Sequence, residues 1–361
     1  MRILQLITRG ELGGAQRYVA ELARRQRALG FEVELATGTL GWLSDQRDCF
    51  DRIHHLPDLI REISPARDSA ALASLVRFLR RRRYDVVHTH CSKAGFLGRI
   101  AAAAVGVTVV AHTSHGTVLS ESISRRRRAM YWMAEQAAAL VTHRLFAVSR
   151  TDRDLLRRSL RTRADALRVM TIVPGYIREM PAAWSLREDS RWDLVAIGNL
   201  YANKGYDTLL PAVATLRDRY PHLRLTIFGE GPERASLESQ IERLGLREHV
   251  RLPGQVTAVA SRIAGSGVYV LPSRKEGLPL ALLEAMATGA PIAATDVGAV
   301  REVLGPNATL ARAERPDDLV RVIDALLSSD DRRMAMALAA RASFEQLLPA
   351  DDPLSARVMY A

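Results

Sequence analysis

Cysteine, lysine and long apolar runs are scarce in this 361-residue sequence. Its two cysteines, Cys49 and Cys91, cannot form the disulfide framework of a small secreted domain, so we expect a reducing compartment. The longest apolar run, residues 100–111, is about half as long as a membrane-spanning helix, and residues 1–10 lack the cleavage site of a signal peptide. These absences predict a soluble, cytoplasmic protein.

Only three of the 51 basic residues are lysines: Lys93, Lys204 and Lys275. Each lies in a glycine-containing turn that precedes a helical pattern. An ammonium group is more compact than the guanidinium group that the chain uses elsewhere, and it sits on a flexible stem. The three lysines are therefore candidates for a functional charge, with chance placement as the alternative.

The basic charge is concentrated in the first half of the chain. Residues 1–180 carry 30 basic and 17 acidic residues, whereas residues 181–361 carry 21 and 23. Arginines cluster at 80–83 and at 125–128. Such clusters are typical of solvated helix faces, or of a surface that binds a phosphorylated acceptor or the anionic inner face of a membrane. A nucleic-acid partner is not expected, because the sequence has no helix-turn-helix, zinc-finger or RNP pattern.

Short apolar runs alternate with amphipathic helical patterns, which predicts βαβ units and parallel sheets. The expected strands are 2–7, 32–37, 85–90, 107–113 and 144–149, and then 193–198, 223–229, 250–254, 267–273 and 290–295. We therefore predict an α/β protein with two Rossmann-like, doubly wound parallel-sheet domains that face a cleft. They would comprise residues 1–175 and 193–361, joined by a linker over 176–192, and the last helix could return to the first domain.

Candidate functional residues of the first half follow its predicted strands, because ligands bind at the carboxyl ends of parallel strands. Gly13 and Gly14 open a helix, where backbone N–H groups can approach an anion, although a plain tight turn fits equally well. Four histidines follow two of the strands: His88, His90, His112 and His115. A zinc site is disfavoured, because no cysteine or carboxylate cluster accompanies them. We expect two of the four to be structural and His115 to be the most exposed to the cleft.

Two glutamates, Glu276 and Glu284, lie eight residues apart in the otherwise apolar segment 273–291. The pattern predicts a helix over 278–289 with Pro279 in its first turn, and eight helical residues span about 12 Å. This is roughly the reach from a ribose to a hexose across a diphosphate. The positive helix N-terminus suits phosphates, and carboxylates accept hydrogen bonds from sugar hydroxyls. The alternative is one acid favoured by the helix dipole and a second that lies on the surface by chance.

Over nearly its whole length the chain resembles the GT-B glycosyltransferases of family 4, the retaining "glycosyl transferases group 1" type. The resemblance rests on GGAQRY, HTHCSKAGFLGRIAA, HTSHG, GNLYANKGYDTLL, FGEGPER and PSRKEGLPLALLEAMATGAPIAATDVGAVRE. The last segment contains the family's E-x7-E pattern as Glu276 and Glu284. The resemblance implies that Glu284 holds the donor ribose and that Glu276 contacts the donor sugar and diphosphate. Lys204 would neutralise the leaving diphosphate, and His115 would touch the donor sugar near the reacting carbon.

The resemblance also implies a wider donor site and an acceptor side. The remaining donor-binding residues would be Gly13, Gly14, Asn199, Gly229, Gly231, Gln255, Gly277, Leu278 and Pro279. His90 and Lys93 would lie on the acceptor side. No metal and no cofactor is implied; the nucleotide-sugar donor, of the UDP or GDP type, is a substrate.

Two positions depart from the family pattern. Asn199 stands where the family usually has an arginine that shares the diphosphate with Lys204, so leaving-group stabilisation is weaker or shifts to Arg274 or Lys275. The segment VPGYIRE at 173–179 replaces the common Pro-Gly-Val/Ile-Asp. The first departure leaves a non-catalytic role open.

Together these features predict a retaining, metal-independent hexosyltransferase that moves a sugar from a nucleotide diphosphate to a hydroxyl of a sugar or lipid-linked acceptor, as in polysaccharide or envelope-glycan biosynthesis. The resemblance suggests front-face attack, in which the leaving phosphate helps to deprotonate the acceptor. Three alternatives remain. A metal-dependent transferase of another fold would need an Asp-x-Asp motif, but the DRD at 152–154 begins a helix, where Asp acts as a cap. The others are a nucleotide-sugar 2-epimerase of the same architecture and a non-catalytic nucleotide-sugar-binding protein.

Overall fold

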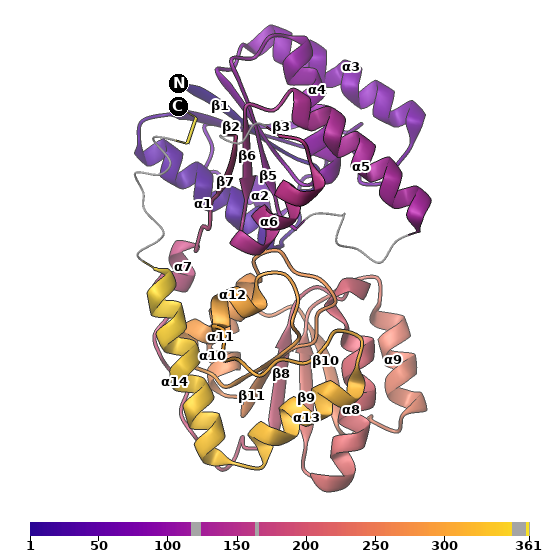
Figure 1. Ribbon diagram of the computed structural model, residues 1–361, viewed down its shortest axis with the longest axis vertical. Coiled ribbons are helices and arrows are strands. Elements are labelled where there is room, and N and C mark those ends of the chain that lie inside the picture. Colours follow the sequence, from indigo (N-terminus) through magenta and orange to yellow (C-terminus); the bar gives the residue numbers. More distant parts are fainter. Residues whose placement is uncertain (117–123, 163–165, 349–358, 361) are drawn as a thin grey trace. The chain divides into compact units, whose positions relative to one another are not determined.

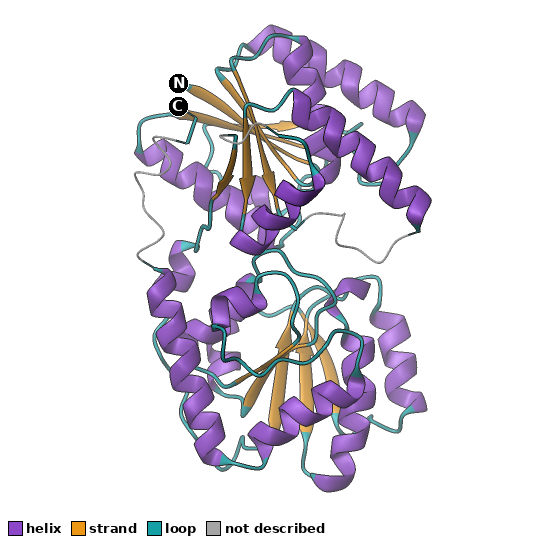
Figure 2. Ribbon diagram, viewed as in Figure 1, coloured by secondary structure: helices purple, strands orange, loops and turns teal. Residues whose placement is uncertain are grey.

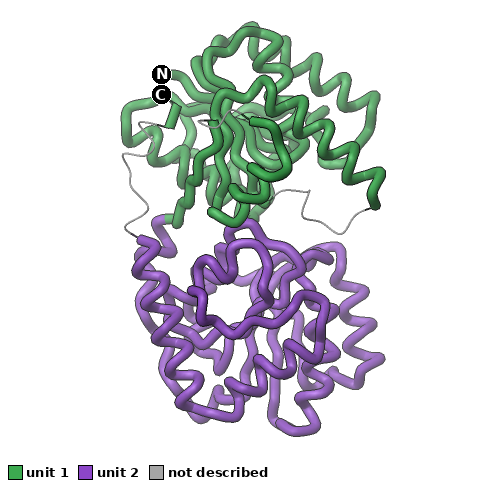
Figure 3. The backbone as a smooth tube through the Cα atoms, viewed as in Figure 1, with its two compact units in different colours: residues 1–174, 351–361 green, residues 175–350 purple. Residues whose placement is uncertain are grey.

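The computed structural model describes residues 1–116, 124–162, 166–348 and 359–360. The chain forms two compact units (Figure 3). Each unit has its own parallel sheet. The first unit comprises residues 1–174 and 351–361, and the second comprises residues 175–350.

Two segments near the unit boundaries have defined places in the fold. Residues 176–192, expected to be a linker, belong to the second unit, where the backbone N–H groups of Ala183 and Trp184 donate to Thr288 O. Met359 and Tyr360 belong to the first unit and are buried there.

The first unit is built on a seven-stranded parallel sheet in the order β3-β2-β1-β4-β5-β6-β7 (Figures 1 and 2). Its strands are β1 (Arg2–Ile7), β2 (Glu32–Thr37), β3 (Arg52–His55), β4 (Val86–His90), β5 (Val109–Ser114), β6 (Arg144–Ala147) and β7 (Leu167–Val169). Its described helices are α1 (Gly14–Ala28), α2 (Trp42–Asp45), α3 (Pro65–Arg82), α4 (Ser92–Ala104), α5 (Arg125–Leu140) and α6 (Arg150–Ser159). The sequence did not predict the edge strands β3 and β7, because both are short and lack the continuous apolar run of an inner strand.

The second unit has a five-stranded parallel sheet in the order β10-β9-β8-β11-β12. Its strands are β8 (Asp193–Ile197), β9 (Arg224–Phe228), β10 (Val250–Gly254), β11 (Val268–Leu271) and β12 (Ile292–Ala294). Its helices are α7 (Gly175–Arg178), the 3-10 turn Ala202–Lys204, α8 (Tyr206–Arg219), α9 (Arg234–Arg243), α10 (Val259–Ala264), α11 (Leu280–Thr288), α12 (Val300–Leu304), α13 (Pro316–Leu327) and α14 (Asp330–Leu347). Its core joins β9 to α8 and α13 through buried side chains such as Ile227, Leu209 and Ile323.

Each sheet has one point at which the strand order reverses. The chain runs outward from β1 to β3 and returns to β4 on the other side of β1, and it repeats this course from β8 to β11. At such a point the loops after the two central strands lead to opposite faces of the sheet, and ligands bind at their carboxyl ends. The prediction of two doubly wound parallel-sheet α/β units is therefore confirmed, and each unit has one natural ligand edge.

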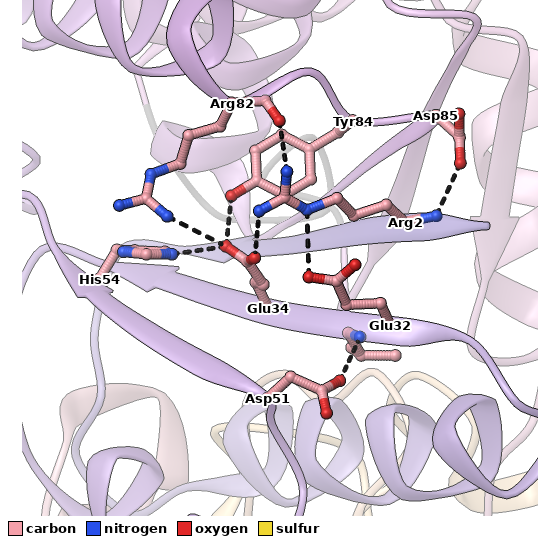
Figure 4. A network of polar contacts seen from close by, with 9 residues as sticks. Arg2, Glu32, Glu34, Asp51, His54, Arg82, Tyr84 and Asp85 are labelled. Atoms are coloured by element: carbon pink, nitrogen blue, oxygen red, sulfur yellow. Dashed lines mark hydrogen bonds and ion pairs between the residues drawn. The ribbon is translucent and has the colours of Figure 1, made fainter.

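The opposite edge of the first sheet holds a buried ionic network centred on Glu34 (Figure 4). Its carboxylate accepts hydrogen bonds from Tyr84 Oη at 2.6 Å and Arg2 Nη2 at 2.5 Å, and it contacts His54 Nε2 at 2.6 Å. Burial opposes the charge of Glu34, but these partners outweigh it and hold the pKa at about 2. Arg2 begins β1 and Tyr84 precedes β4, so the network reaches from the middle of β2 to the amino ends of these strands, away from the ligand edge.

Candidate active site

The reversal point of the second sheet brings together two residues that the sequence separates by 72 positions. Lys204 Nζ donates to Glu276 Oε1 at 2.7 Å, and Ser273 Oγ donates to the same oxygen at 2.6 Å. Lys204 ends the 3-10 turn after β8, whereas Ser273 and Glu276 follow β11. The predicted diphosphate lysine and the first predicted glutamate therefore form one ion pair at the ligand edge.

Close backbone packing fixes this ion pair from both sides. Gly205, which follows Lys204, has a left-handed φ of 68°, and a Cβ there would lie 2.1 Å from Pro272 O. Gly298 similarly approaches Glu276, since its Cβ would lie 2.0 Å from Glu276 O. Only glycine fits either position, so the loops after β8, β11 and β12 hold Lys204 and Glu276 against each other.

Glu284 is buried in the middle of α11 and is held by a tyrosine. Tyr176 Oη donates to Glu284 Oε1 at 2.7 Å. The alternative that Glu284 is a chance surface acid is therefore wrong. The sequence did not single out Tyr176 as a site residue, although it lies in the VPGYIRE segment that departs from the family pattern.

The predicted helical spacing of the two glutamates is also wrong. α11 begins at Leu280, with Pro279 as its N-cap and Gly289 as its left-handed C-cap, so Glu276 lies in the turn before the helix. A span of eight helical residues therefore does not describe their separation. Glu276 lies in the turn, beside Lys204, and Glu284 lies in the helix, beside Tyr176.

Arg274 is fixed outside the Lys204–Glu276 pair. Its Nη1 and Nη2 donate to the two carboxylate oxygens of Asp207 at 2.7 and 2.6 Å, and its Nε donates to Glu314 at 3.0 Å. With these partners the guanidinium joins the start of α8 to the loop before α13. This geometry argues against the expectation that Arg274 supplies the positive charge that is absent at Asn199.

Three loops beside Asn199 pack with almost no side-chain volume between them. A Cβ at Gly229 would lie 2.0 Å from Gly198 O, and a Cβ at Gly231 would lie 2.4 Å from Leu200 O. The Gly229 N–H donates to Gly254 O at 2.8 Å, directly before Gln255. The loops after β8, β9 and β10 thus gather the expected donor-side positions Asn199, Gly229, Gly231 and Gln255.

The first unit places three expected residues at the reversal point of its own sheet. α1 begins at Gly14 with Gly13 as an extended N-cap, as the glycine pair predicted. Lys93 Nζ donates to Glu62 O at 2.7 Å and forms an ion pair with Asp68. These partners fix Lys93 to the segment where α3 begins.

All four histidines of the cluster have hydrogen-bond partners, and His88, His90 and His112 are buried, whereas His115 is half-buried. His88 contacts Thr113 and Tyr360, His112 contacts Thr89, and His90 contacts Gln5 and His115. Burial lowers the pKa of His115 to about 3 and that of His90 well below the usual range, so both imidazoles are neutral. Among the described residues, no group of three or more His, Cys, Asp or Glu side chains is arranged to hold a metal ion.

The DRD segment lies in the first turns of helix α6. α6 begins at Arg150, and its N-cap is Ser149, whose hydroxyl accepts a hydrogen bond from the Asp152 N–H at 3.0 Å. The helix was expected there, but the cap is the serine that precedes it and not an aspartate.

Two family models match the chain. The model described as "Glycosyltransferase Family 4" matches residues 12–172, and the model described as "Glycosyl transferases group 1" matches residues 182–343. The chain is 30% identical over 280 residues to the UDP-Gal:alpha-D-GlcNAc-diphosphoundecaprenol alpha-1,3-galactosyltransferase of Escherichia coli, covering 74% of this chain and 72% of that protein. It is 27% identical over 370 residues to the D-inositol 3-phosphate glycosyltransferase of Corynebacterium urealyticum, covering 91% and 85%.

Solved structures share the fold at lower identity. The sucrose-phosphate synthase from Thermosynechococcus elongatus has a TM-score of 0.81 at 20% identity, covering 100% of this chain and 98% of that chain. The HepE protein of Anabaena in complex with UDP-glucose has a TM-score of 0.77 at 18% identity, with coverages of 100% and 98%.

Two doubly wound parallel-sheet units of this kind define the GT-B class of glycosyltransferases. Within that class the chain belongs to glycosyltransferase family 4, of the group 1 type, and it is an enzyme that transfers sugars. The expectations of fold class, family and enzyme class are confirmed. The roles of individual residues, the retention of configuration and the independence of metal stay predictions.

Proposed function

We propose that this glycosyltransferase is retaining and metal-independent, and that it moves a hexosyl group from a UDP- or GDP-sugar to a hydroxyl of a lipid-linked glycan precursor. The observation that carries the proposal is the Lys204–Glu276 pair at the ligand edge of the second unit. This pair supplies one cation for a diphosphate and one carboxylate for sugar hydroxyls, and the two groups are hydrogen-bonded to each other.

Each group has one task in the proposed reaction. Glu284 accepts hydrogen bonds from the ribose hydroxyls, and Glu276 orients the donor sugar. The bond between the anomeric carbon and the diphosphate oxygen breaks while the acceptor oxygen bonds to the same face of that carbon. The acceptor proton passes to the departing phosphate oxygen, and Lys204 stabilises the negative charge that develops there. A fixed cation at such a charge acts mainly in the transition state.

The glycan acceptor is proposed from chemistry shared with a relative. The E. coli relative that covers 74% of this chain is named for a diphosphoundecaprenol-linked acceptor, which is a lipid diphosphate. The first half of the present chain has the excess of arginine that an anionic lipid substrate requires. None of the helices formed by the described residues is both long and apolar enough to cross a bilayer. We therefore propose contact with the membrane through a surface helix.

Helix α5 has the composition of such a surface helix. Arg125–Arg128 are all exposed in its first turn. Met130, Met133 and Leu140 follow with 41%, 58% and 77% of their surface exposed, at spacings that place them along one face. The acidic residue of α5, Glu135, is paired with Arg99 at 2.7 Å. Exposed methionine and leucine side chains beside an arginine cluster fit the interface of an anionic membrane.

A donor and acceptor screen tests the proposed function. The purified protein is incubated with UDP- and GDP-sugars and with a synthetic lipid-diphosphate sugar, in EDTA, and the products are identified by mass spectrometry. We expect glycosylated acceptor whose new anomeric centre has the donor's configuration by NMR coupling. Conversion of the donor without an acceptor would favour the 2-epimerase, and an inverted product or dependence on manganese would overturn the proposal.

A further inference from the structure

A chain of hydrogen bonds connects His115 with the interior of the first unit. His115 Nε2 and His90 Nδ1 are 3.1 Å apart, and His90 Nε2 lies 2.7 Å from Gln5 Oε1. Gln5 Nε2 donates in turn to Gln26 Oε1 at 2.7 Å. His90, Gln5 and Gln26 are completely buried, so water cannot replace any of these partners.

The series of hydrogen bonds continues from Gln26 to Tyr360, more than 330 positions away in the sequence. Gln26 Nε2 donates to Tyr360 Oη at 2.7 Å, and Tyr360 Oη lies 2.8 Å from His88 Nδ1. His88 Nε2 ends the sequence of contacts at Thr113 Oγ1, 2.7 Å away. Tyr360 and its neighbour Met359 are buried in the same unit. They join the strands β1, β4 and β5 to helix α1.

Met359 decides the direction in which the hydrogen bonds run. Its Sδ lies 3.8 Å from Gln26 Nε2 and can only accept, so it favours the amide orientation that points NH2 toward both Met359 and Tyr360. Gln26 Oε1 then faces Gln5 Nε2, and Gln5 Oε1 faces His90. Without the thioether and the phenol, the reversed orientation of both amides would satisfy the same pairs equally well.

This direction fixes the tautomers of the two histidines. Because Gln5 Oε1 can only accept, the proton of neutral His90 lies on Nε2, and its Nδ1 carries a lone pair. That lone pair requires a proton on His115 Nε2, which leaves His115 Nδ1 as an acceptor. Tyr18 packs edge-on against the His115 ring, with centroids 4.8 Å apart at 85°, and fixes the ring plane.

We propose that Met359 and Tyr360 are positioning residues for His115. They set the direction of the hydrogen-bond chain so that His115 presents an unprotonated Nδ1 to a hydroxyl group of the donor sugar. The hydroxyl contact rests on the proposed function, in which His115 touches the donor sugar, whereas the tautomers follow from the network alone. A segment distant in sequence thus controls the protonation pattern at the ligand edge of the first unit.

Imidazole NMR tests the network without any activity. In the full-length protein with 15N-labelled histidine, we expect His115 and His90 as Nε2–H tautomers, assigned with single histidine variants. Tyr360→Phe removes the nearer of the two acceptors of Gln26 Nε2 and should give His115 a mixture of tautomers or the Nδ1–H form. Met359→Leu keeps the packing, removes the sulfur acceptor and should shift the tautomers of His115 in the same direction. This variant replaces Tyr360→Phe in the test if Tyr360→Phe does not fold.

Tyr84→Phe is the matched control, since it also removes a buried phenol from the first unit, at Glu34, and should leave both tautomers unchanged.

Kinetics tests the link to the sugar. At saturating donor, Tyr360→Phe should lower the single-turnover rate about 3- to 10-fold, the worth of one neutral hydrogen bond, and should have no further effect in a His115→Ala background.

Unchanged tautomers in Tyr360→Phe and Met359→Leu would overturn the proposal. Altered tautomers with an unchanged rate would overturn the role toward the sugar hydroxyl. Failure to turn over any donor would count against the proposed function alone, because the NMR experiment still decides whether Met359 and Tyr360 set the tautomer of His115.

Discussion

Lys204 and Glu276 form an ion pair with 2.7 Å between Nζ and Oε1, across the loops that follow β8 and β11. The lysine retains 23% of its side-chain exposure, whereas the carboxylate retains 8%. A diphosphate can therefore approach the ammonium while Glu276 keeps its bond from Ser273. In the proposed reaction, one cation serves where the resemblance to the family implies two, because Asn199 occupies the arginine position and Arg274 is bound to Asp207.

The first prediction concerns this single cation. Lys204→Ala should lower kcat by about 10²- to 10³-fold, the usual cost of removing one preorganised group that stabilises developing charge. The loss should appear in the single-turnover rate more than in donor affinity, since the charge builds up in the transition state. Lys204→Arg is the control that retains a positive charge. Turnover of Lys204→Ala within a few-fold of wild type would show that another group stabilises the diphosphate.

The second prediction concerns the buried carboxylate of α11. Glu284→Ala should weaken binding of the donor nucleotide by about 1.5–3 kcal/mol, because a charged acceptor for the ribose hydroxyls is lost. Calorimetry with UDP and GDP measures this directly. Tyr176→Phe is the matched control: it removes one protein donor to Glu284 but leaves the carboxylate, so affinity should be maintained or rise. Normal nucleotide binding by Glu284→Ala would make Glu284 a structural residue held by Tyr176.

The third prediction concerns acid stability. The pKa of Glu34 is about 2 in the folded protein against an ordinary value of 4.5, so its ionised form stabilises the fold above pH 4.5. That contribution should be lost as the pH falls from 4.5 toward 2. Glu34→Gln should cost about 1.5–3 kcal/mol at neutral pH, since Arg2, Tyr84 and His54 would lose a charged acceptor, and should flatten the acid slope.

Urea unfolding at several pH values between 6 and 3 checks the acid prediction. Glu32→Gln is the control, because Glu32 lies on the same strand and contacts Arg2 at 3.3 Å, but its side chain is half exposed. The acid slope of Glu32→Gln should match that of wild type. An unchanged slope in Glu34→Gln would mean that another carboxylate controls unfolding in this range.

The inner strands could be predicted from the sequence for a physical reason. A strand buried on both faces needs apolar residues, and RILQLI is apolar except at Arg2 and Gln5, whereas the edge strand RIHH has Ile53 alone. The pairing of Glu276 with Lys204 was not predictable from spacing, because a turn and not a helix carries Glu276. Its position depends on close approaches at Gly205 and Gly298, which only the folded backbone defines.

The network at His115 had one signal in the sequence. Gln5 interrupts an apolar strand, and a buried amide must find hydrogen-bond partners. Its partners are Gln26 in α1 and His90 in β4, and no local pattern relates positions so far apart. Tyr176 had a signal as well, since it stands in the departure VPGYIRE, but its contact with Glu284 depends on how α7 packs on α11.

The last prediction concerns the exposed face of α5. The protein should sediment with vesicles that contain anionic lipid at low salt and dissociate as the salt concentration rises, because screening weakens the attraction of Arg125–Arg128. Replacing these arginines with serine should lower vesicle affinity at least about tenfold, given about 1 kcal/mol per basic residue near such a surface. Met133→Ser combined with Leu140→Ser should also lower it, but with little change in salt dependence. Leu338→Ser removes a comparably exposed apolar side chain from α14 in the second unit and should change nothing. Equal sedimentation with neutral and anionic vesicles, or an equal loss in Leu338→Ser, would show that α5 is an ordinary solvated helix.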